Sequence, residues 1–174
     1  MEKNSLKKSK ERKTLESLFM TAVSSADPMK VIPKILPPKP KGNVFIFGIG
    51  KASARMAEAV ETVWKDCKGT VITKYGYARK LNAIKVIEAN HPIPDIKGFI
   101  ATEQIIKKFK KFKKDDFVLL LLSGGGSALL SAPIQGLSFN DKKEVHEALL
   151  KCGAPISKVN TIRKHLSKVK GGQL

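Results

Sequence analysis

The sequence has few cysteines and no long hydrophobic run. Cys67 and Cys152 stand apart, with neither a CxxC pair nor a metal-ligand spacing, which argues against a disulfide scaffold and a zinc site and predicts a reduced, cytoplasmic protein. The longest wholly apolar run covers residues 117–122, whereas a membrane-spanning helix needs about 20 residues. Residues 1–13 are basic, and no apolar stretch follows them. We therefore expect no signal peptide and no membrane partner.

Acidic, aromatic and arginine residues are also scarce. The 174 residues include 33 Lys plus Arg against 15 Asp plus Glu, a net charge of +18, yet only four of the basic residues are arginines. Nucleic-acid recognition favours the planar guanidinium and aromatic stacking surfaces, and the chain has only 11 aromatic residues. We therefore expect no specific nucleic-acid partner, only nonspecific binding to polyanions at low salt.

Hydrophobic patterning predicts an α/β fold. Apolar, β-branched and aromatic runs predict strands over residues 43–49, 70–73, 83–88 and 117–122, the last being the most deeply buried. Helical periodicity predicts helices over residues 14–25, 29–35, 51–65, 98–114, 140–151 and 156–169. Apolar strands separated by helices are typical of an open, doubly wound, mostly parallel sheet of Rossmann-like form, covered on both faces. Ligands of such sheets bind where strands lead into helices.

The first such loop is Gly48-Ile49-Gly50-Lys51-Ala52-Ser53. Gly48 and Gly50 would let a ligand approach the backbone, and the helix that follows offers N–H groups to an anion. The loop is not a dinucleotide fingerprint, because Ser53 replaces the third glycine and the next strand ends at Lys74 instead of an acid. Lys51 is expected in a first helical turn, where the helix dipole disfavours a cation. This placement indicates that Lys51 binds a phosphate or carboxylate. A tight turn with a solvated lysine explains the loop equally well.

The second loop, Ser123-Gly124-Gly125-Gly126-Ser127, directly follows the apolar run. Consecutive glycines destabilise regular structure. Their use here would be a nest of backbone N–H groups that binds phosphate or carboxylate, with Ser123 and Ser127 adding hydroxyl donors. A flexible surface loop is the alternative, and the abrupt change from apolar strand to glycines favours the anion site.

The third loop, residues 90–95, contains His91 between an asparagine and two stiffening prolines. His91 would act as a general acid or base or contact a ligand, although a lone histidine beside proline more often packs a turn. In the last helix, Ile162, Leu166 and Val169 fall on one face and polar residues cover the rest. A solvated surface is the simplest reading of that polar face, as it is for His146.

These four pieces, in this order, make the chain resemble the glycerate 2-kinase family from about Leu15 to the last residue. Bacterial members of that family are often named hydroxypyruvate reductases. The resemblance implies ATP-dependent phosphoryl transfer to the 2-hydroxyl of D-glycerate, with Mg2+. It implies that Lys51 is the active-site lysine and that residues 124–127 bind an anion. It also places a basic helix near the cleft, through Asn160, Arg163, Lys164 and His165.

Family members are much longer than this chain. We therefore expect residues 1–13 to form a basic tail and residues 14–174 an incomplete amino-terminal domain, with the second domain absent. Such a chain holds one wall of a site that lies between domains, to be completed by a second polypeptide or a homodimer. No carboxylate is an obvious base or Mg2+ ligand, and Asp95 is the nearest candidate. A hydroxypyruvate reductase and an inactive gene remnant remain as alternatives.

Overall fold

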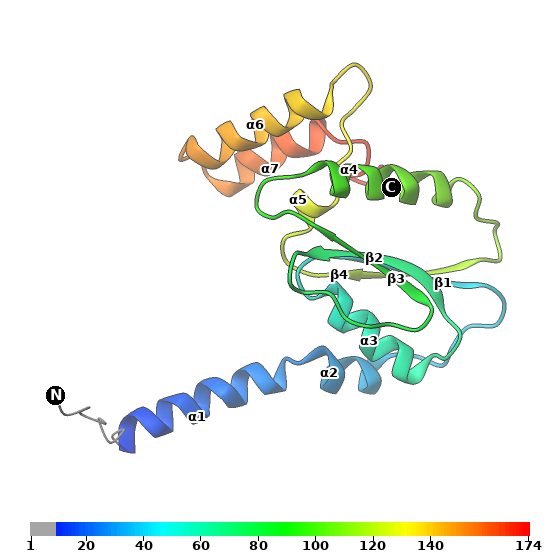
Figure 1. Cartoon of the computed structure of the whole chain (residues 1–174), viewed down its shortest axis with the longest axis vertical. Coiled ribbons are helices and arrows are strands. Elements are labelled where there is room, and N and C mark those ends of the chain that lie inside the picture. The colour runs from blue at the N-terminus through cyan, green and yellow to red at the C-terminus, as the bar shows by residue number, and fades with distance from the viewer. Residues whose placement is uncertain (1–9) are drawn as a thin grey trace.

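The computed structural model describes residues 10–174 (Figure 1). Four strands form one sheet: β1 (Val44–Ile49), β2 (Lys68–Lys74), β3 (Ile84–Ala89) and β4 (Phe117–Leu122). All pairings are parallel and the strand order is β3-β2-β1-β4, which confirms the predicted parallel α/β fold. The chain moves outward from β1 to β3 and then crosses to the other side of β1. The carboxyl ends of β1 and β4 therefore meet at the topological switch point.

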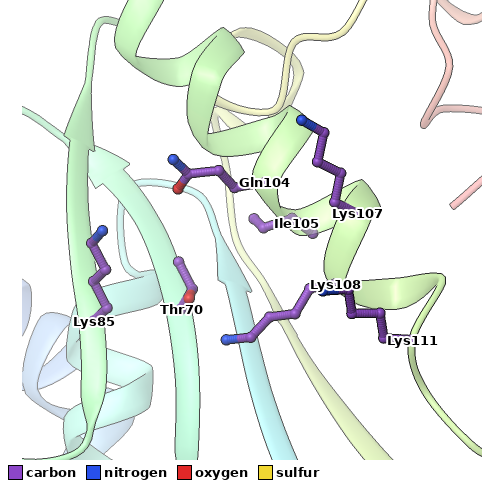
Figure 2. A pocket seen from close by; sticks show the side chains of 7 residues that line it. All are labelled: Thr70, Lys85, Gln104, Ile105, Lys107, Lys108 and Lys111. Carbon is purple, nitrogen blue, oxygen red and sulfur yellow. The ribbon is translucent and has the colours of Figure 1, made fainter.

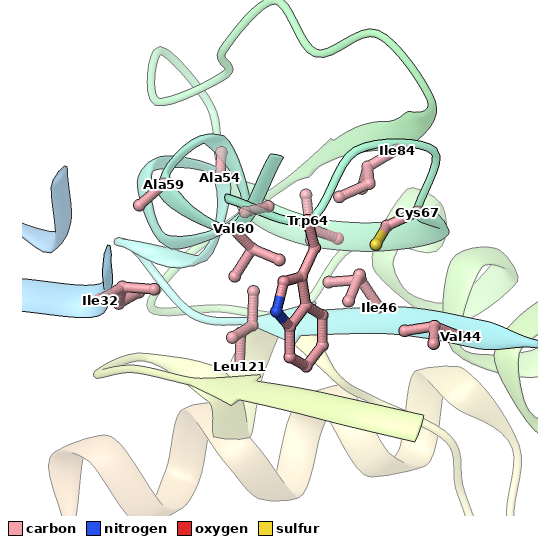
Figure 3. Packing of buried hydrophobic residues seen from close by; sticks show 12 residues of the cluster. Ile32, Val44, Ile46, Ala54, Ala59, Val60, Trp64, Cys67, Ile84 and Leu121 are labelled. Atoms are coloured by element: carbon pink, nitrogen blue, oxygen red, sulfur yellow. The ribbon is translucent and has the colours of Figure 1, made fainter. Parts of the chain in front are cut away.

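Two helices cover opposite faces of the sheet (Figure 1). On one face, α3 (Ser53–Val63) packs over Ile46 and Val71, and Trp64 fills the space beneath it (Figure 3). Trp64 is 1% exposed, and its indole N–H donates to the Pro37 carbonyl at 2.9 Å. On the other face, α4 (Ile96–Phe109) packs over an aromatic and aliphatic cluster that includes Phe47. This burial of apolar area is the main stabilising contribution to the fold.

The prediction that residues 117–122 form the most deeply buried strand is wrong. β4 lies at one edge of the sheet, with β1 as its neighbour, and Leu120 and Leu122 are 41% and 62% exposed. The apolar run predicted the strand, but no local pattern indicates which strand lies at an edge. The expectation of full cover on both faces fails at β4 for the same reason.

Two amino-terminal helices precede the sheet. The α1 helix (Lys10–Ser25) projects away from the body (Figure 1), and α2 (Pro28–Ile35) packs against α3. Asp27 caps α2 and pairs with Arg55 at 2.9 Å. Of the expected basic tail, residues 1–9 lie outside the described residues, and residues 10–13 form the first turn of α1. No helix within residues 10–174 is long and apolar enough to cross a bilayer.

The remaining helices lie near the carboxyl edge of the sheet: α5 (Gly126–Leu129), α6 (Phe139–Lys151) and α7 (Ile156–His165). Three predicted helices are too long, and of the predicted helix over residues 51–65 only Ser53–Val63 form α3. The α4 helix ends at Phe109 instead of residue 114, where like-charged lysines accumulate. The α7 helix ends at His165 instead of residue 169, because the Lys168 N–H donates to the Ala132 carbonyl at 3.1 Å and turns the chain back. Val169 is therefore not part of the α7 face.

Candidate functional site

Two loops from neighbouring strands meet at the switch point. The Lys51 N–H donates to the Gly124 carbonyl at 2.8 Å, and the Ala52 N–H donates to the Ser123 hydroxyl at 3.0 Å. Gly50 permits this approach: a Cβ there would lie 2.2 Å from the Ser123 Oγ, and its φ of +126° is one that L side chains rarely adopt. The first and second predicted motifs therefore form one structural unit.

Gly48 and Lys51 differ from their expected places. Gly48 lies inside β1, where a Cβ would meet the Val71 side chain at 2.5 Å, so its lack of a side chain serves packing. The α3 helix begins at Ser53 after the N-cap Ala52, so Lys51 precedes the helix and does not occupy its first turn. The argument from an unfavourable helix dipole is therefore wrong for Lys51.

His91 brings the third loop to the same place. A Cβ on Gly125 would lie 2.9 Å from the His91 Cδ2 and 3.2 Å from the Lys51 Cγ. The His91 imidazole and the aliphatic part of the Lys51 side chain thus both lie against the backbone of Gly125. Gly125 itself has a φ of +94°, which favours glycine. The structure therefore places Lys51, His91 and Gly125 side by side.

His91 lies in a positively charged surrounding. Burial lowers the pKa of its imidazole, and the ammonium groups of Lys51 and Lys74 lower it further. The ring is therefore neutral at pH 7, and one of its nitrogens can accept a proton.

The glycine loop presents unused backbone donors beside these side chains. Within residues 10–174, the N–H groups of residues 124–127 donate no hydrogen bond to a backbone or side-chain acceptor. They follow the carboxyl end of β4 and lead into α5. Adjacent unpaired N–H groups in such a loop form a concavity that suits an oxyanion.

Asp95 is not a free carboxylate. It caps α4 by accepting from the Gly98 N–H at 2.8 Å, and its other oxygen accepts from the Tyr75 hydroxyl at 2.8 Å. In the described part of the chain, no three His, Cys, Asp or Glu side chains gather as metal ligands would. The described residues alone therefore supply no complete set of protein ligands for Mg2+, an ion that proteins usually hold through one or two carboxylates together with substrate phosphates.

A cavity of about 360 Å³ opens between the glycine loop and α7. Ile49 of β1, Leu122 of β4 and Leu130, which follows α5, form its apolar wall. The rest of its lining comprises Gly126, Ser127, Asn160, Arg163, Lys164, Lys170 and Gly171. The structure thus brings three residues predicted on the last helix opposite the glycine loop. His165 does not line this cavity; its Nδ1 lies 2.9 Å from the Thr161 carbonyl oxygen of its own helix.

Basic side chains gather in and beside this cavity. Lys142 and His146 of α6 are only 8% and 7% exposed, so the prediction that His146 is a surface residue is wrong. Three nitrogens point at backbone carbonyl oxygens: Lys142 Nζ at Ala132 (2.7 Å), Lys170 Nζ at Leu130 (2.8 Å) and His146 Nε2 at Pro92 (2.9 Å). The Nε of Arg163 is buried with no hydrogen-bond partner in the described structure.

This basic cluster has no acidic counterpart. Burial, together with a smaller effect of basic neighbours, lowers the pKa of Lys142 to about 7, of Lys170 to about 8 and of His146 to about 4. Burial also lowers the pKa of Arg163. No carboxylate contributes to any of these shifts. An anion in the neighbouring cavity would offset this unbalanced charge.

Sequence reasoning missed the burial of Lys142 and Lys170. As residue types, both look like the many other lysines of this chain. The only local signal is the Gly171-Gly172 pair after Lys170, which marks a turn in the backbone. Lys142 carries no signal of its own, because its burial depends on the distant segment that supplies the Ala132 carbonyl.

Comparison with known proteins identifies relatives of the whole arrangement. The family model described as "Domain of unknown function (DUF4147)" matches residues 14–174. The glycerate 2-kinase of Pyrococcus horikoshii is 46% identical over 134 residues, covering 77% of this chain and 30% of that protein. The D-glycerate 2-kinase of Thermotoga maritima is 38% identical over 165 residues, covering 93% and 38%. An Agrobacterium vitis protein named "Putative hydroxypyruvate reductase" is 45% identical over 165 residues, covering 94% and 38%.

Solved structures agree with these sequence matches. The crystal structure of Thermotoga maritima glycerate kinase superimposes with a TM-score of 0.82 at 36% identity, covering 92% of this chain and 41% of that one. A Pyrococcus horikoshii structure gives a TM-score of 0.82 at 38% identity, covering 93% and 40%. The chain thus spans well under half the length of these relatives. It belongs to the DUF4147 family and corresponds to the amino-terminal portion of the glycerate 2-kinases.

Proposed function

We propose that this chain forms the amino-terminal wall of a glycerate 2-kinase site, which transfers the terminal phosphoryl group of ATP to the 2-hydroxyl of D-glycerate. The observation that carries the proposal is the meeting of Lys51, His91 and the glycine loop at the switch point. Both substrates are anions, and this surface offers an ammonium group and unpaired N–H donors. The relatives named glycerate 2-kinases support the same reaction.

Phosphoryl transfer requires chiefly positioning and charge neutralisation. The N–H groups of residues 124–127 would hold an oxyanion, and Lys51, whose stem lies along that loop, would neutralise charge on the transferred group. Donors fixed in place before the reaction stabilise a transition state without reorganisation. The cavity lined by Asn160, Arg163 and Lys164 would receive a second anionic group, either a carboxylate or a phosphate.

The proton of the glycerate hydroxyl needs an acceptor. In the proposed step the glycerate 2-oxygen bonds to the terminal phosphorus, and the bond from that phosphorus to the bridging oxygen breaks, releasing ADP. The neutral ring of His91, adjacent to Lys51, would take the hydroxyl proton. We assign no step to Mg2+, for which the described residues alone offer no complete ligand set.

A hydroxypyruvate reductase has less support in this structure. The Ser53 hydroxyl is buried and donates to the Gly50 and Ile72 carbonyls at 2.8 and 3.0 Å, in the position of the third fingerprint glycine. The following strand ends at Lys74, where a ribose-binding acid is expected in nicotinamide enzymes. An inactive remnant is the other alternative.

A complementation assay tests the proposal. The chain would be mixed with a second polypeptide carrying the remaining part of the Thermotoga maritima D-glycerate 2-kinase, and ADP formation would be followed with and without D-glycerate. We expect glycerate-dependent ADP only in the mixture, and a loss of about 100-fold or more with Lys51→Ala. Lys80→Ala, at an exposed lysine away from the site, is the matched control and should leave the rate unchanged.

Three results would contradict the proposal. Undiminished turnover with Lys51→Ala would remove that lysine from the mechanism. A mixture that forms a stable complex but makes no glycerate-dependent ADP would favour the inactive remnant. Oxidation of NADH or NADPH by hydroxypyruvate, in place of ADP formation, would favour the reductase.

A further inference from the structure

A second cationic pocket lies at the end of the sheet opposite the glycine loop. It occupies about 310 Å³ between β2, β3 and the last turns of α4, and its lining is Thr70, Lys85, Gln104, Ile105, Lys107, Lys108 and Lys111 (Figure 2). Thr70 is the third residue of β2 and Lys85 the second of β3, so both lie toward the amino ends of their strands. The pocket is therefore separate from the candidate kinase site.

The pocket offers donors and no acidic group. Its lining includes four lysines and no carboxylate, and within residues 10–174 none of these lysines forms an ion pair. Figure 2 shows Lys108 extending from α4 toward Thr70, with Lys85 on the next strand. The Thr70 side chain is almost buried, at 9% exposure, and its hydroxyl makes no hydrogen bond to another described residue. The site is thus a concave, positively charged surface in which Thr70 is almost buried and the four lysines are exposed.

Three of the four lysines gather where α4 ends. Lys107 and Lys108 lie in its last turn and Lys111 lies two residues beyond Phe109, so like charges lie close together. The carboxyl end of the α4 dipole offsets part of their repulsion. The Lys108 ammonium also lies 5.9 Å from the centre of the Phe47 ring, which holds its stem against the sheet. The nearby Asp116 is already engaged by Asn43 and the Lys113 N–H.

We propose that this pocket binds the phosphate end of a di- or triphosphate, whether free or carried by a nucleotide. Lysine ammonium groups act as point-charge partners for phosphate oxygens, and several of them match a ligand with several negative charges. The volume of about 310 Å³ suits a compact anion better than a length of polynucleotide. The pocket lining also lacks the arginine and aromatic groups that bind bases. This inference is independent of the proposed kinase function.

Nuclear magnetic resonance of the isotope-labelled full chain locates the binding without mutation. Inorganic triphosphate is the first probe, and ADP and adenosine follow at equal concentration. We expect triphosphate and ADP to shift the amide signals of Thr70, Lys85 and Gln104 and adenosine to leave them unchanged. Shifts by adenosine alone would assign the pocket to a base and overturn the proposal. Triphosphate shifts confined to residues 124–127 or to α7 would overturn it too.

Charge-matched variants test the role of the lysines. Lys85→Gln, Lys108→Gln and Lys111→Gln combined should weaken triphosphate binding about tenfold or more. The control combines Lys13→Gln, Lys41→Gln and Lys80→Gln, which removes the same charge from exposed positions elsewhere. An equal loss in both proteins would show nonspecific attraction and overturn the proposal.

Two further measurements keep the test decisive. If the triple variant fails to show a cooperative melting transition by circular dichroism, Lys108→Gln alone serves with the same resonance readout. Tighter binding of a single-stranded oligonucleotide, with shifts spread along α4 beyond the pocket, would overturn the proposal in favour of a nucleic-acid surface. Triphosphate binding that survives excess oligonucleotide would support it.

Discussion

Replacing Gly50 with alanine tests how tightly the two loops of the candidate site are held together. A Cβ at position 50 would lie 2.2 Å from the Ser123 Oγ and 2.4 Å from the Ser123 carbonyl oxygen. The hydroxyl can rotate away, but the carbonyl belongs to backbone whose N–H donates to the Ile49 carbonyl at 2.9 Å. The added methyl group would push the loop at Gly50 away from the loop at Ser123, and an alanine would be strained at a φ of +126°. Together these two effects should lower the free energy of unfolding by about 3 kcal/mol.

Gly76→Ala provides the matched control for backbone strain alone. Gly76 also has a positive φ, +80°, but nothing lies within 4 Å of a Cβ built there, so we expect a loss of about 1 kcal/mol. Urea unfolding would be followed by the fluorescence of Trp64, which is the one tryptophan in the chain and 1% exposed. If Gly50→Ala were no more destabilising than Gly76→Ala, the close contact between the loops would be refuted.

Two pH-dependent predictions follow from buried or paired charges. Burial lowers the pKa of Lys142 from 10.5 to about 7, so between these values the unfolded chain holds a proton that the folded chain lacks, and stability rises with pH. Lys142→Met should raise stability at pH 7 and reduce the increase of stability with pH. The Ala132 carbonyl keeps a donor in this variant, because the Lys168 N–H donates to it at 3.1 Å. Urea midpoints at pH 7 and 9.5 measure the change of stability with pH, and an unchanged pH dependence would contradict the prediction. The hydrogen-bonded Arg55 lowers the pKa of Asp27 from 3.8 to about 2, so the stabilising ionised form is present above pH 3.8 and is lost as the pH falls through 2. The advantage of the wild type over Asp27→Asn should therefore shrink between pH 5 and pH 2, and a constant difference in urea midpoint would argue against the ion pair.

The sheet and its loops could be predicted from sequence because local chemistry encodes them. Runs rich in branched and aromatic residues become β1, β2 and β3 with small errors at their ends. Glycines mark the turn at Gly50 and the loop at Gly125, where positive φ values favour them. The parallel order then brings the carboxyl ends of β1 and β4 to one edge. That both ends lie at one edge follows from the parallel fold, whereas the pairing of β4 with β1 depends on the strand order.

The other parts of the site depend on contacts between distant segments. His146 and Lys142 look like surface residues because their own helix is polar, and only packing against Pro92 and Ala132 buries them. The exposure of Leu122 likewise follows from the place of β4 in the sheet and not from its apolar sequence. A single sequence carries no record of such tertiary packing.

The most direct test of the central claim is a calorimetric titration of the chain with 2-phosphoglycerate, the product that the proposed reaction would form. Binding to one wall requires no turnover, so the titration separates recognition from catalysis. We expect measurable affinity for the wild type and for the Lys80→Ala control, and affinity weaker by about tenfold or more for Lys51→Ala. Equal affinity in all three proteins, or no binding by the wild type, would contradict an anion site formed by Lys51 and the glycine loop.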